Sequence, residues 1–576
     1  MLCGICDHLE IVANDFIIKP EDDTSKFDES HDLGTLHEIR QRAHYCPSCC
    51  LFVEAIGASE HPSSQLEKNI QCQLYWMSEG FVSTEEGPTV RCLRLSAQPW
   101  PHAFNEFNRL TILAEDAPDG HRLFFSRKIP SERLSVKLIK KWVKSCQRWH
   151  GEDCEEPLTK SVLEMPPNFR VIDTWARCVV QAPPHCRYLT LSYVWGPIEV
   201  FKLTSSNIKM LAGPGGLKKV WHCLPTTIQD AITLTSSLSE RYIWIDSMCI
   251  IQDDDADKRG LIPHMDLIYD RGFMTIVAAT GDNANAGLPG VRKKSRSCVQ
   301  MVEELRPSLR LTCPKHLTDL LNNSVYESRG WTFDSMSKHC LSGFASAGEP
   351  HADYAGSLYE YSHRKLSYDS DILNAFAGIS KILFKRIEDN STKETNSVYG
   401  LPVNELDWAL LWQANKTAHR RSGWWPSWSW CGWSGGVYML LSDLKYLDLQ
   451  DWLRNHTWID WITYSVDGRP QTRIPSDCVY QRSETRWPPL THPPIVKAQP
   501  HDVLSTERFY IANAHDALRL QSQLVYDQAG CLPLLHFASL SAKFYLQVTD
   551  DLTNDDEPID RSYKICDSTK TPCGCI

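Results

Sequence analysis

Three runs of β-branched and aromatic residues stand out in the middle of the chain, at about 188–195, 242–250 and 274–279. Each run is apolar enough to be a strand that is covered on both faces. Two stretches with apolar residues at helical spacing separate the runs, at about 227–238 and 261–271. Strands that alternate with helices predict adjacent parallel strands joined by right-handed crossovers.

Polar side chains come late in the first two runs, and open parallel sheets bind ligands at the carboxyl ends of their strands. The sequence therefore predicts a pocket walled by Ser192, Tyr193, Trp195, Gly196 and Asp246. In this interpretation Gly196 lets a ligand approach closely. Two alternatives stay open. Gly196 could simply form the turn after a packed strand, and Asp246 could bond backbone amides in its own turn.

The 576 residues are enough for several domains. We expect an N-terminal cysteine-containing regulatory region at 1–165, an α/β core at 170–345, an extension with a Trp-rich segment at 346–440, and a variable region at 441–576. The tryptophans between Trp408 and Trp433 favour a packed aromatic core seam over a ligand box. Short apolar runs interrupted by Pro and Asp indicate a mixed or β-rich C-terminal region.

Two cysteine pairs near the N-terminus have the spacing of zinc ligands: Cys3 with Cys6, and Cys46 with Cys49. Histidines nearby could replace a thiolate, namely His8, His37 and His44. The alternative is a set of free buried thiols, because Cys is among the most buried residue types. The first residues lack the basic and apolar stretches of a secretory signal, so disulfides are not expected among the 22 cysteines.

The bulk properties exclude some classes of partner. The net charge is −11, which gives no reason to expect nucleic-acid binding. No run approaches the roughly 18 uninterrupted apolar residues that a membrane-spanning helix needs, so no membrane partner is expected. Hydrophobic residues make up 42% of the chain, enough for a large core. These properties together predict a globular protein of the cytosol.

Several blocks resemble, in order, those of the fungal heterokaryon incompatibility (HET) domain. They are Ser192–Gly196, Leu224–Ala231, Trp244–Gln252, Met265–Tyr269, Thr275–Ala278, Arg329–Phe333 and Pro426–Trp433. The resemblance implies a role in nonself recognition and programmed cell death, with a protein partner or self-association. It also implies a core remotely similar to the TIR domain, which has a flavodoxin-like parallel sheet.

Several TIR domains cleave NAD, so the resemblance raises an NAD glycohydrolase as a possible activity. Such enzymes carry the pattern Ser-x-x-Trp-x-x-x-Glu, whose carboxylate offsets positive charge developing on the ribose. Ser328 and Trp331 match the pattern and would join the pocket, but Ser335 stands where the Glu is expected. Asp334 and Glu327 are the nearest substitute carboxylates.

A serine carries no negative charge, so the departure at Ser335 favours a signalling or pseudo-enzymatic module over an NAD-cleaving effector. A third possibility is a HET-derived protein recruited to another pathway. The sequence names neither the partner nor the trigger.

Overall fold

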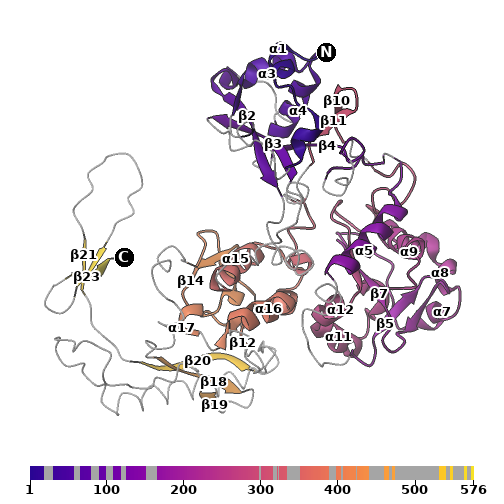
Figure 1. The fold of residues 1–576 in the computed structure, drawn as a ribbon. Helices are drawn as coiled ribbons and strands as arrows, with labels where there is room; N and C mark the ends of the chain where they lie inside the picture. Colours follow the sequence, from indigo (N-terminus) through magenta and orange to yellow (C-terminus); the bar gives the residue numbers. More distant parts are fainter. Residues whose placement is uncertain are drawn as a thin grey trace. The chain divides into compact units, whose positions relative to one another are not determined.

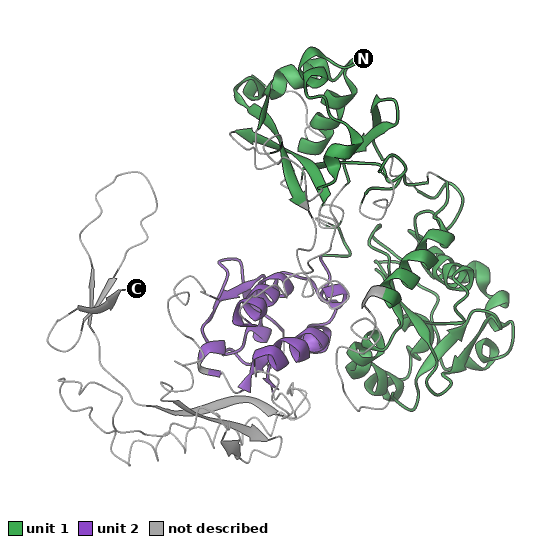
Figure 2. Cartoon of the chain, in the orientation of Figure 1, with its two compact units in different colours: residues 1–327 green, residues 328–576 purple. Residues whose placement is uncertain are grey.

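The structure is a computed structural model that describes most of the first 439 residues and six strands beyond them. The described residues are 1–118 without 19–26, 28–29, 58–64, 80–89 and 99–107; 125–150 without 131; 165–333 without 297–299, 315–320 and 322–323; 350–439 without 388–396, 404–405 and 423–424; and 459–465, 470–473, 531–539, 545–548, 563–566 and 572–575. The chain divides into two compact units, residues 1–327 and 328–576 (Figure 2).

The N-terminal part of the first unit is built on a six-stranded antiparallel sheet in the order β1-β2-β3-β4-β11-β10. Four of its strands are consecutive in the chain: β1 (His31–Thr35), β2 (Gln71–Glu79), β3 (Val90–Gln98) and β4 (Arg109–Ile112). The other two form a hairpin from much later, β10 (Val302–Arg306) and β11 (Leu309–Thr312), with Leu311 opposite Ile112. The chain therefore returns to complete its first sheet.

Short helices accompany this sheet: α1 (Gly4–His8), η1 (Ala13–Phe16), α3 (Leu36–Arg42), α4 (Pro47–Ile56) and η3 (Gln65–Asn69). Thr35 and Glu38 form a reciprocal capping box that starts α3. Helix α4 begins with a proline in its first turn and ends at Gly57, whose φ of 81° is left-handed. The apolar sides of α3 and α4 join the buried core of this sheet.

The second sheet has the order β6-β5-β8-β7-β9 and contains the three strands expected from the sequence. Its strands are β5 (Arg170–Asp173), β6 (Cys178–Gln181), β7 (Tyr188–Ser192), β8 (Tyr242–Trp244) and β9 (Met274–Val277). Strand β7 is parallel to both β8 and β9, which confirms the predicted adjacent parallel strands. Strand β5, in contrast, is antiparallel to β8 and β6, so the sheet is mixed.

Helices of the second sheet's region are α5 (Val136–His150), α7 (Ile208–Ala212), α8 (Gly216–Lys219), η4 (Trp221–Cys223), α9 (Thr226–Ser237), α10 (Asp246–Cys249), α11 (Asp255–Leu261), η5 (Ile262–His264) and α12 (Met265–Asp270). The expected helix at 227–238 is α9. The one expected at 261–271 is a turn of 3₁₀-helix followed by α12. Because the crossovers from β7 to β8 and from β8 to β9 run in opposite directions, the right-handed rule puts α9 and α12 on opposite faces, as Figure 1 shows.

One sequence expectation about this sheet is wrong in length. The strand expected at about 242–250 ends at Trp244, and the chain turns at once into α10. Ser247, Met248 and Cys249 are fully buried in that helical turn, so an apolar run that reads as strand is shared between strand and helix.

The helices of the second unit are η6 (Gly330–Thr332), α15 (Pro350–Ser362), η7 (Asp369–Asp371), η8 (Asn374–Phe376), α16 (Ala377–Ile387), α17 (Leu406–Ala409) and η10 (Trp430–Gly432). Its short strands are β12 (Ser397–Val398), β13 (Leu401–Pro402), β14 (Trp412–Ala414), β15 (His419–Arg420), β16 (Trp433–Ser434) and β17 (Val437–Met439). They pair antiparallel as β12-β13, β14-β17 and β15-β16.

The Trp-rich segment packs in the core of the second unit, as the aromatic-seam interpretation expects. Trp408 and Trp430 are almost completely buried, and Trp430 meets Phe376 edge-on with ring centroids 5.2 Å apart. Trp424 lies outside the described residues. The elements described after residue 440 are all strands: β18 (Ile459–Ser465), β19 (Pro470–Arg473), β20 (Cys531–Ser539), β21 (Tyr545–Val548), β22 (Tyr563–Cys566) and β23 (Pro572–Cys575).

Candidate functional site

Asp246 occupies the carboxyl end of β8 and is the first residue of α10. Its Oδ1 accepts a hydrogen bond from the backbone N–H of Ser247 at 2.6 Å. Its Oδ2 accepts one from the indole N–H of Trp195 at 3.0 Å. Trp195 follows β7, which is parallel to β8, so two predicted pocket residues do meet at the carboxyl ends of neighbouring strands. Asp246 also bonds a backbone amide in its own turn, as the alternative interpretation expects.

Hydroxyl groups surround this carboxylate. Ser192 and Tyr326 are hydrogen bonded through their hydroxyls at 2.7 Å, and both are buried. The Tyr193 hydroxyl donates to the hydroxyl of Ser247 at 2.8 Å. The Tyr269 hydroxyl donates to the carbonyl of Leu191 at 3.0 Å. The residues gathered here are called the strand-end cluster: Ser192, Tyr193, Trp195, Asp246, Ser247, Tyr269 and Tyr326.

The phenols of the strand-end cluster are proton donors that stay protonated. Burial, and next the negative charge of Asp246, raise the pKa of Tyr193 well above its ordinary value. The same two causes, in the same order, raise the pKa of Tyr269. Neither phenol can therefore serve as a base near neutral pH, and the carboxylate sits among neutral hydrogen-bond donors.

Gly196 is required by a contact within the protein. Its φ is +72°, and a Cβ built on it would lie 2.3 Å from the Cβ of Asn283. The backbone N–H of Ala284 donates to the carbonyl of Trp195 at 3.1 Å. The close approach at Gly196 is thus made by the loop at 281–284. This contact supports the alternative in which Gly196 forms the turn after a packed strand.

The residues of the Ser-x-x-Trp pattern belong to the second unit. Trp331 donates its indole N–H to the Oδ2 of Asp371 at 3.1 Å, and burial raises the pKa of Asp371. The carbonyl of Ser328 accepts the backbone N–H of Lys365 at 2.6 Å. These contacts fasten the segment to its own unit. Glu327, the last residue of the first unit, has its backbone N–H bonded to the Ser324 hydroxyl. Asp334 and Ser335 lie outside the described residues.

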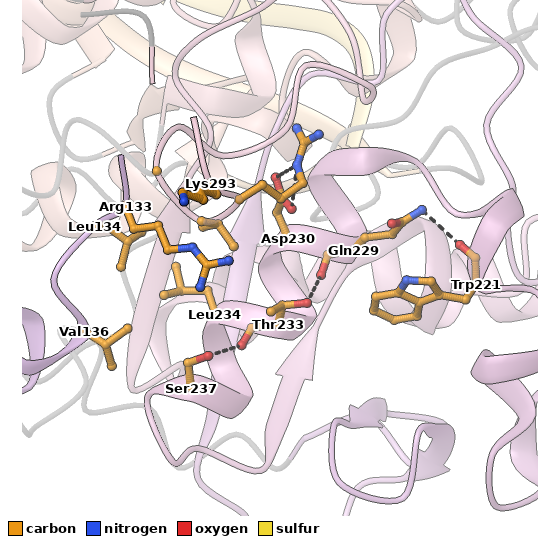
Figure 3. A pocket seen from close by; sticks show the side chains of 13 residues that line it. Arg133, Leu134, Val136, Trp221, Gln229, Asp230, Thr233, Leu234, Ser237 and Lys293 are labelled. Carbon is orange, nitrogen blue, oxygen red and sulfur yellow. Dashed lines mark hydrogen bonds and ion pairs between the residues drawn. The ribbon is translucent and has the colours of Figure 1, made fainter. Parts of the chain in front are cut away.

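A cavity of about 420 Å³ opens along α9 (Figure 3). Its floor includes Leu134, Val136 and Leu234, and its rim carries Arg133 and Lys293. The hydroxyls of Thr233 and Ser237 donate to carbonyls of their own helix, and buried Asp230 is paired with Arg292 at 3.1 Å. None of the pocket residues expected from the sequence lines this cavity, whose polar groups mostly serve the fold.

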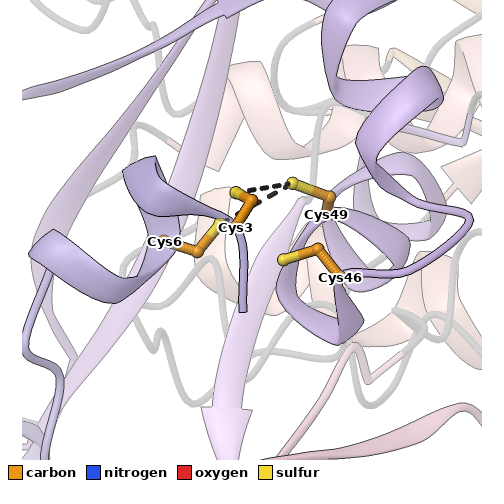
Figure 4. Close-up of side chains that lie close together, drawn as sticks. All are labelled: Cys3, Cys6, Cys46 and Cys49. Atoms are coloured by element: carbon orange, nitrogen blue, oxygen red, sulfur yellow. Dashed lines mark hydrogen bonds between the residues drawn. The ribbon is translucent and has the colours of Figure 1, made fainter. Parts of the chain in front are cut away.

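Four cysteines converge in the N-terminal part of the first unit (Figure 4). The sulfurs of Cys3, Cys6, Cys46 and Cys49 all lie within 4.8 Å of one another. Cys49 Sγ is 3.8 Å from Cys3 Sγ and 3.6 Å from Cys6 Sγ. All four side chains are buried and are free thiols. This four-cysteine cluster could bind a metal ion such as zinc.

The cluster joins the two pairs expected from spacing and excludes the histidine substitutes. His8 bonds instead to the carbonyl of Gly4 at 3.1 Å, and His37 bonds to the side chain of Gln41 at 3.0 Å. The spacing of the cysteines was sufficient to predict this cluster because each pair lies at the start of a helix.

Tyr269 and Tyr326 of the strand-end cluster were not predicted from the sequence. Tyr269 has only helical spacing, which indicates a core residue, and Tyr326 has no periodic pattern at all.

Comparison with known proteins yields one family. No significant match was found among curated proteins or among solved structures. The family model described as heterokaryon incompatibility protein (HET) matches residues 188–334. The match begins at β7, contains the whole strand-end cluster and the β10–β11 hairpin, and ends in the second unit. Residues 188–334 are thus the part of this chain that is similar to the heterokaryon incompatibility family.

Proposed function

We propose that this protein acts in heterokaryon incompatibility as a signalling module, which recognises nonself through a protein partner or self-association and triggers cell death. The observation that carries the proposal is the use of both Asp246 oxygens inside the protein: one accepts from Trp195 and the other from the Ser247 amide. Groups that would form a ligand wall instead hold β7, β8 and α10 together.

The contacts of Asp246 weaken the case for catalysis. A carboxylate that stabilises a developing oxocarbenium charge must face the reacting sugar. Asp246 instead faces the indole of Trp195, and Gly196 faces Asn283 rather than open space. Ser335 adds no charge at the position where the family resemblance expects a Glu.

The rival is an NAD glycohydrolase, and one observation favours it. The strand-end cluster lies where open α/β sheets bind ligands, and the strand order β8-β7-β9 corresponds to the first three strands of a flavodoxin-like sheet. In this rival, NAD would be a substrate held by Ser192, Tyr193, Trp195, Gly196 and Asp246, and the family resemblance adds Ser328, Trp331 and the weak carboxylates Asp334 and Glu327. A HET-derived protein working in another pathway is the third possibility.

The proposal puts the protein in the cytosol, without a nucleic-acid or membrane partner. Among the helices that the structure describes, none has the length and apolarity needed to cross a bilayer. The division into a regulatory region at 1–165, a core at 170–345, an extension at 346–440 and a variable region at 441–576 stays part of the proposal.

Nicotinamide release from NAD by the purified full chain separates the two functions. The signalling module releases no more nicotinamide than buffer does, and its expression still triggers cell death in a fungal host. The matched variants are Asp246→Asn and Glu199→Gln, since Glu199 is an exposed carboxylate just beyond Gly196.

Wild-type turnover that falls about 10²–10³-fold in Asp246→Asn but persists in Glu199→Gln would overturn the proposal in favour of the enzyme. The enzyme interpretation also expects Ser335→Glu to raise nicotinamide release, whereas a signalling module gains nothing from that change. Circular dichroism of each variant checks that the fold is unchanged.

A further inference from the structure

The four-cysteine cluster has the dimensions of a metal-thiolate cage. With Zn–S bonds of about 2.3 Å, the edge of a tetrahedron of sulfurs is about 3.8 Å. The measured separations of Cys49 Sγ from Cys3 Sγ and Cys6 Sγ are 3.8 and 3.6 Å. A disulfide would bring two sulfurs to about 2.05 Å, far closer than either pair.

Each cysteine pair is placed in the same way. Cys3 is the N-cap of α1 and Cys46 is the N-cap of α4, so the second cysteine of each pair falls in the first helical turn. This geometry turns both sulfurs of a pair toward one point in front of the helix. The ten-residue α4 adds the positive end of its dipole, which favours thiolates at Cys46 and Cys49.

A positive side chain stands beside the cluster. Four thiolates around one divalent ion leave a net negative charge, which burial would make costly without a counter-charge. Arg42, the last residue of α3, interacts with the sulfur of Cys49 and also donates to the carbonyl of Leu33. The cluster thus takes its ligands from the starts of α1 and α4 and its counter-charge from α3.

The residues around the cluster also hold the β10–β11 hairpin. The guanidinium of Arg306, at the end of β10, donates to the carbonyl of Asp7 in α1 at 3.1 Å. Helix α4 packs directly against β10. On the other strand, Arg310 forms two hydrogen bonds through its side chain to Asp116, at 2.9 and 2.6 Å. Both cysteine-bearing helices therefore contact β10.

We propose that Cys3, Cys6, Cys46 and Cys49 bind one Zn²⁺, and that this ion fixes α1 and α4 in the positions in which they hold the β10–β11 hairpin of the HET domain. The ion joins the start of the chain to α4, and these two segments contact β10. Zinc thereby ties residues 302–312 of the HET domain to the N-terminal sheet. This inference does not depend on whether the domain signals or cleaves NAD.

The first experiment measures metal content and coordination in the full chain. Protein purified without added metal is expected to hold about one zinc per chain by elemental analysis. Replacement by Co²⁺ is expected to give the visible bands of a tetrahedral tetrathiolate site. Cys49→Ser loses the metal, whereas Cys50→Ser and Cys72→Ser keep it, since Cys50 follows on the same helix and Cys72 is a buried thiol of the same core. Metal-free wild type, whether its four thiols are reduced or paired as disulfides, overturns the site, and so does equal loss in the control variants.

The second experiment tests the link to the HET hairpin with wild-type protein, so that misfolded variants cannot confuse it. Hydrogen exchange is followed with and without a zinc chelator. Removal of zinc is expected to raise exchange about ten-fold or more at 302–312 and to leave 188–192 unchanged. Unchanged exchange at 302–312 would show that the ion, if bound, does not hold the hairpin. Equal loss at 188–192 would contradict the selective link.

Discussion

The two sheets of the first unit are stabilised by different means. The N-terminal sheet gathers four buried thiols at the starts of α1 and α4, besides the buried ion pair of Glu67 with Arg40. The mixed sheet instead buries three aspartates that fasten loops to strands: Asp173, Asp230 and Asp257. Both sheets have large buried apolar cores, so the difference between them lies in their buried polar groups.

The buried carboxylates act as connectors between backbone segments. Asp173 accepts the N–H groups of Trp175 and Ala176 and pairs with Arg241. Asp230 accepts the N–H of Leu288, far along the chain, and pairs with Arg292. All these partners lie between residues 170 and 292. The mixed sheet is therefore clamped from within one continuous stretch, whereas the N-terminal sheet pairs Ile112 with Leu311, which lies 199 residues later.

The largest expected effect comes from removing one such clamp. Asp257 is 6% exposed and bonds Arg170, Asn168 and the N–H of Ile251. Asp257→Ala would leave the Arg170 charge buried without its partner, so we expect a loss of about 3–5 kcal/mol in unfolding free energy. This loss in unfolding free energy is measured by urea unfolding, with hydrogen exchange of residues 170–192 as the signal.

The matched control for this prediction lies in the same helix. Asp255 is exposed and pairs with Lys258 one turn away, so Asp255→Ala should cost less than about 0.5 kcal/mol. Similar losses in both variants would mean that the carboxylate clamps do not distinguish the mixed sheet.

Two glycines give an opposite pair of predictions. Gly196→Ala must place a side chain at φ +72° against Asn283, so we expect a loss of about 1–3 kcal/mol. Gly4→Ala in α1 meets nothing within 4 Å, and alanine's better helix propensity should stabilise the N-terminal part by up to about 1 kcal/mol. Thermal unfolding of the two variants provides the measurement. Destabilisation by Gly4→Ala would show that the packing around α1 is tighter than described.

The smallest effect concerns acid. The side-chain hydrogen bonds of Arg310 hold the pKa of Asp116 below its ordinary value of 3.8. A lowered pKa in the folded state stabilises the protein above the unfolded value, near about 3.9, and that contribution is lost as the pH falls through the folded value. Arg310 is 34% exposed, so solvent screening limits the pair to about 1 kcal/mol.

The acid prediction is tested with Asp116→Asn. Exchange at 302–312, corrected for intrinsic rates, should be faster than in wild type above about pH 4, and the two proteins should converge below it. The exposed pair of Lys293 and Glu132, which lies outside the hairpin, serves as the control, because Lys293→Gln should change little. A difference that persists at low pH would assign the effect to shape rather than charge.

The parallel strands and their crossovers could be predicted from the sequence because apolar periodicity is a local signal. Local signals failed where a distant contact decides the outcome. Nothing in residues 302–312 indicates that β11 pairs with β4. Strands β5 and β6 were not predicted for a similar reason, because their antiparallel pairing is set by tertiary contacts rather than by a local hydrophobic pattern. Three strands of this sheet are therefore adjacent and parallel as expected, and the sheet as a whole is mixed.

The candidate sites show the same limit. The cysteine pairs were found because ligand spacing is a strong local pattern, and the structure brings the pairs together. At the strand ends, the closeness of Trp195 to Asp246 follows from parallel register. The hydrogen-bond partner of Ser192, in contrast, is Tyr326, which lies 134 residues later. The role of Gly196 could not be decided from sequence, because a ligand and the 281–284 loop demand the same small residue.

The late β10–β11 hairpin has a consequence for how the protein is made. During synthesis β4 emerges with one edge unpaired, and about 200 further residues must follow before β11 can cover it. An unpaired edge invites association with other nascent chains until the β10–β11 hairpin pairs with β4. Cleavage of the chain at residue 188 would place β4 and the β10–β11 hairpin on separate fragments. Neither fragment would then contain both partners of the β4–β11 pairing.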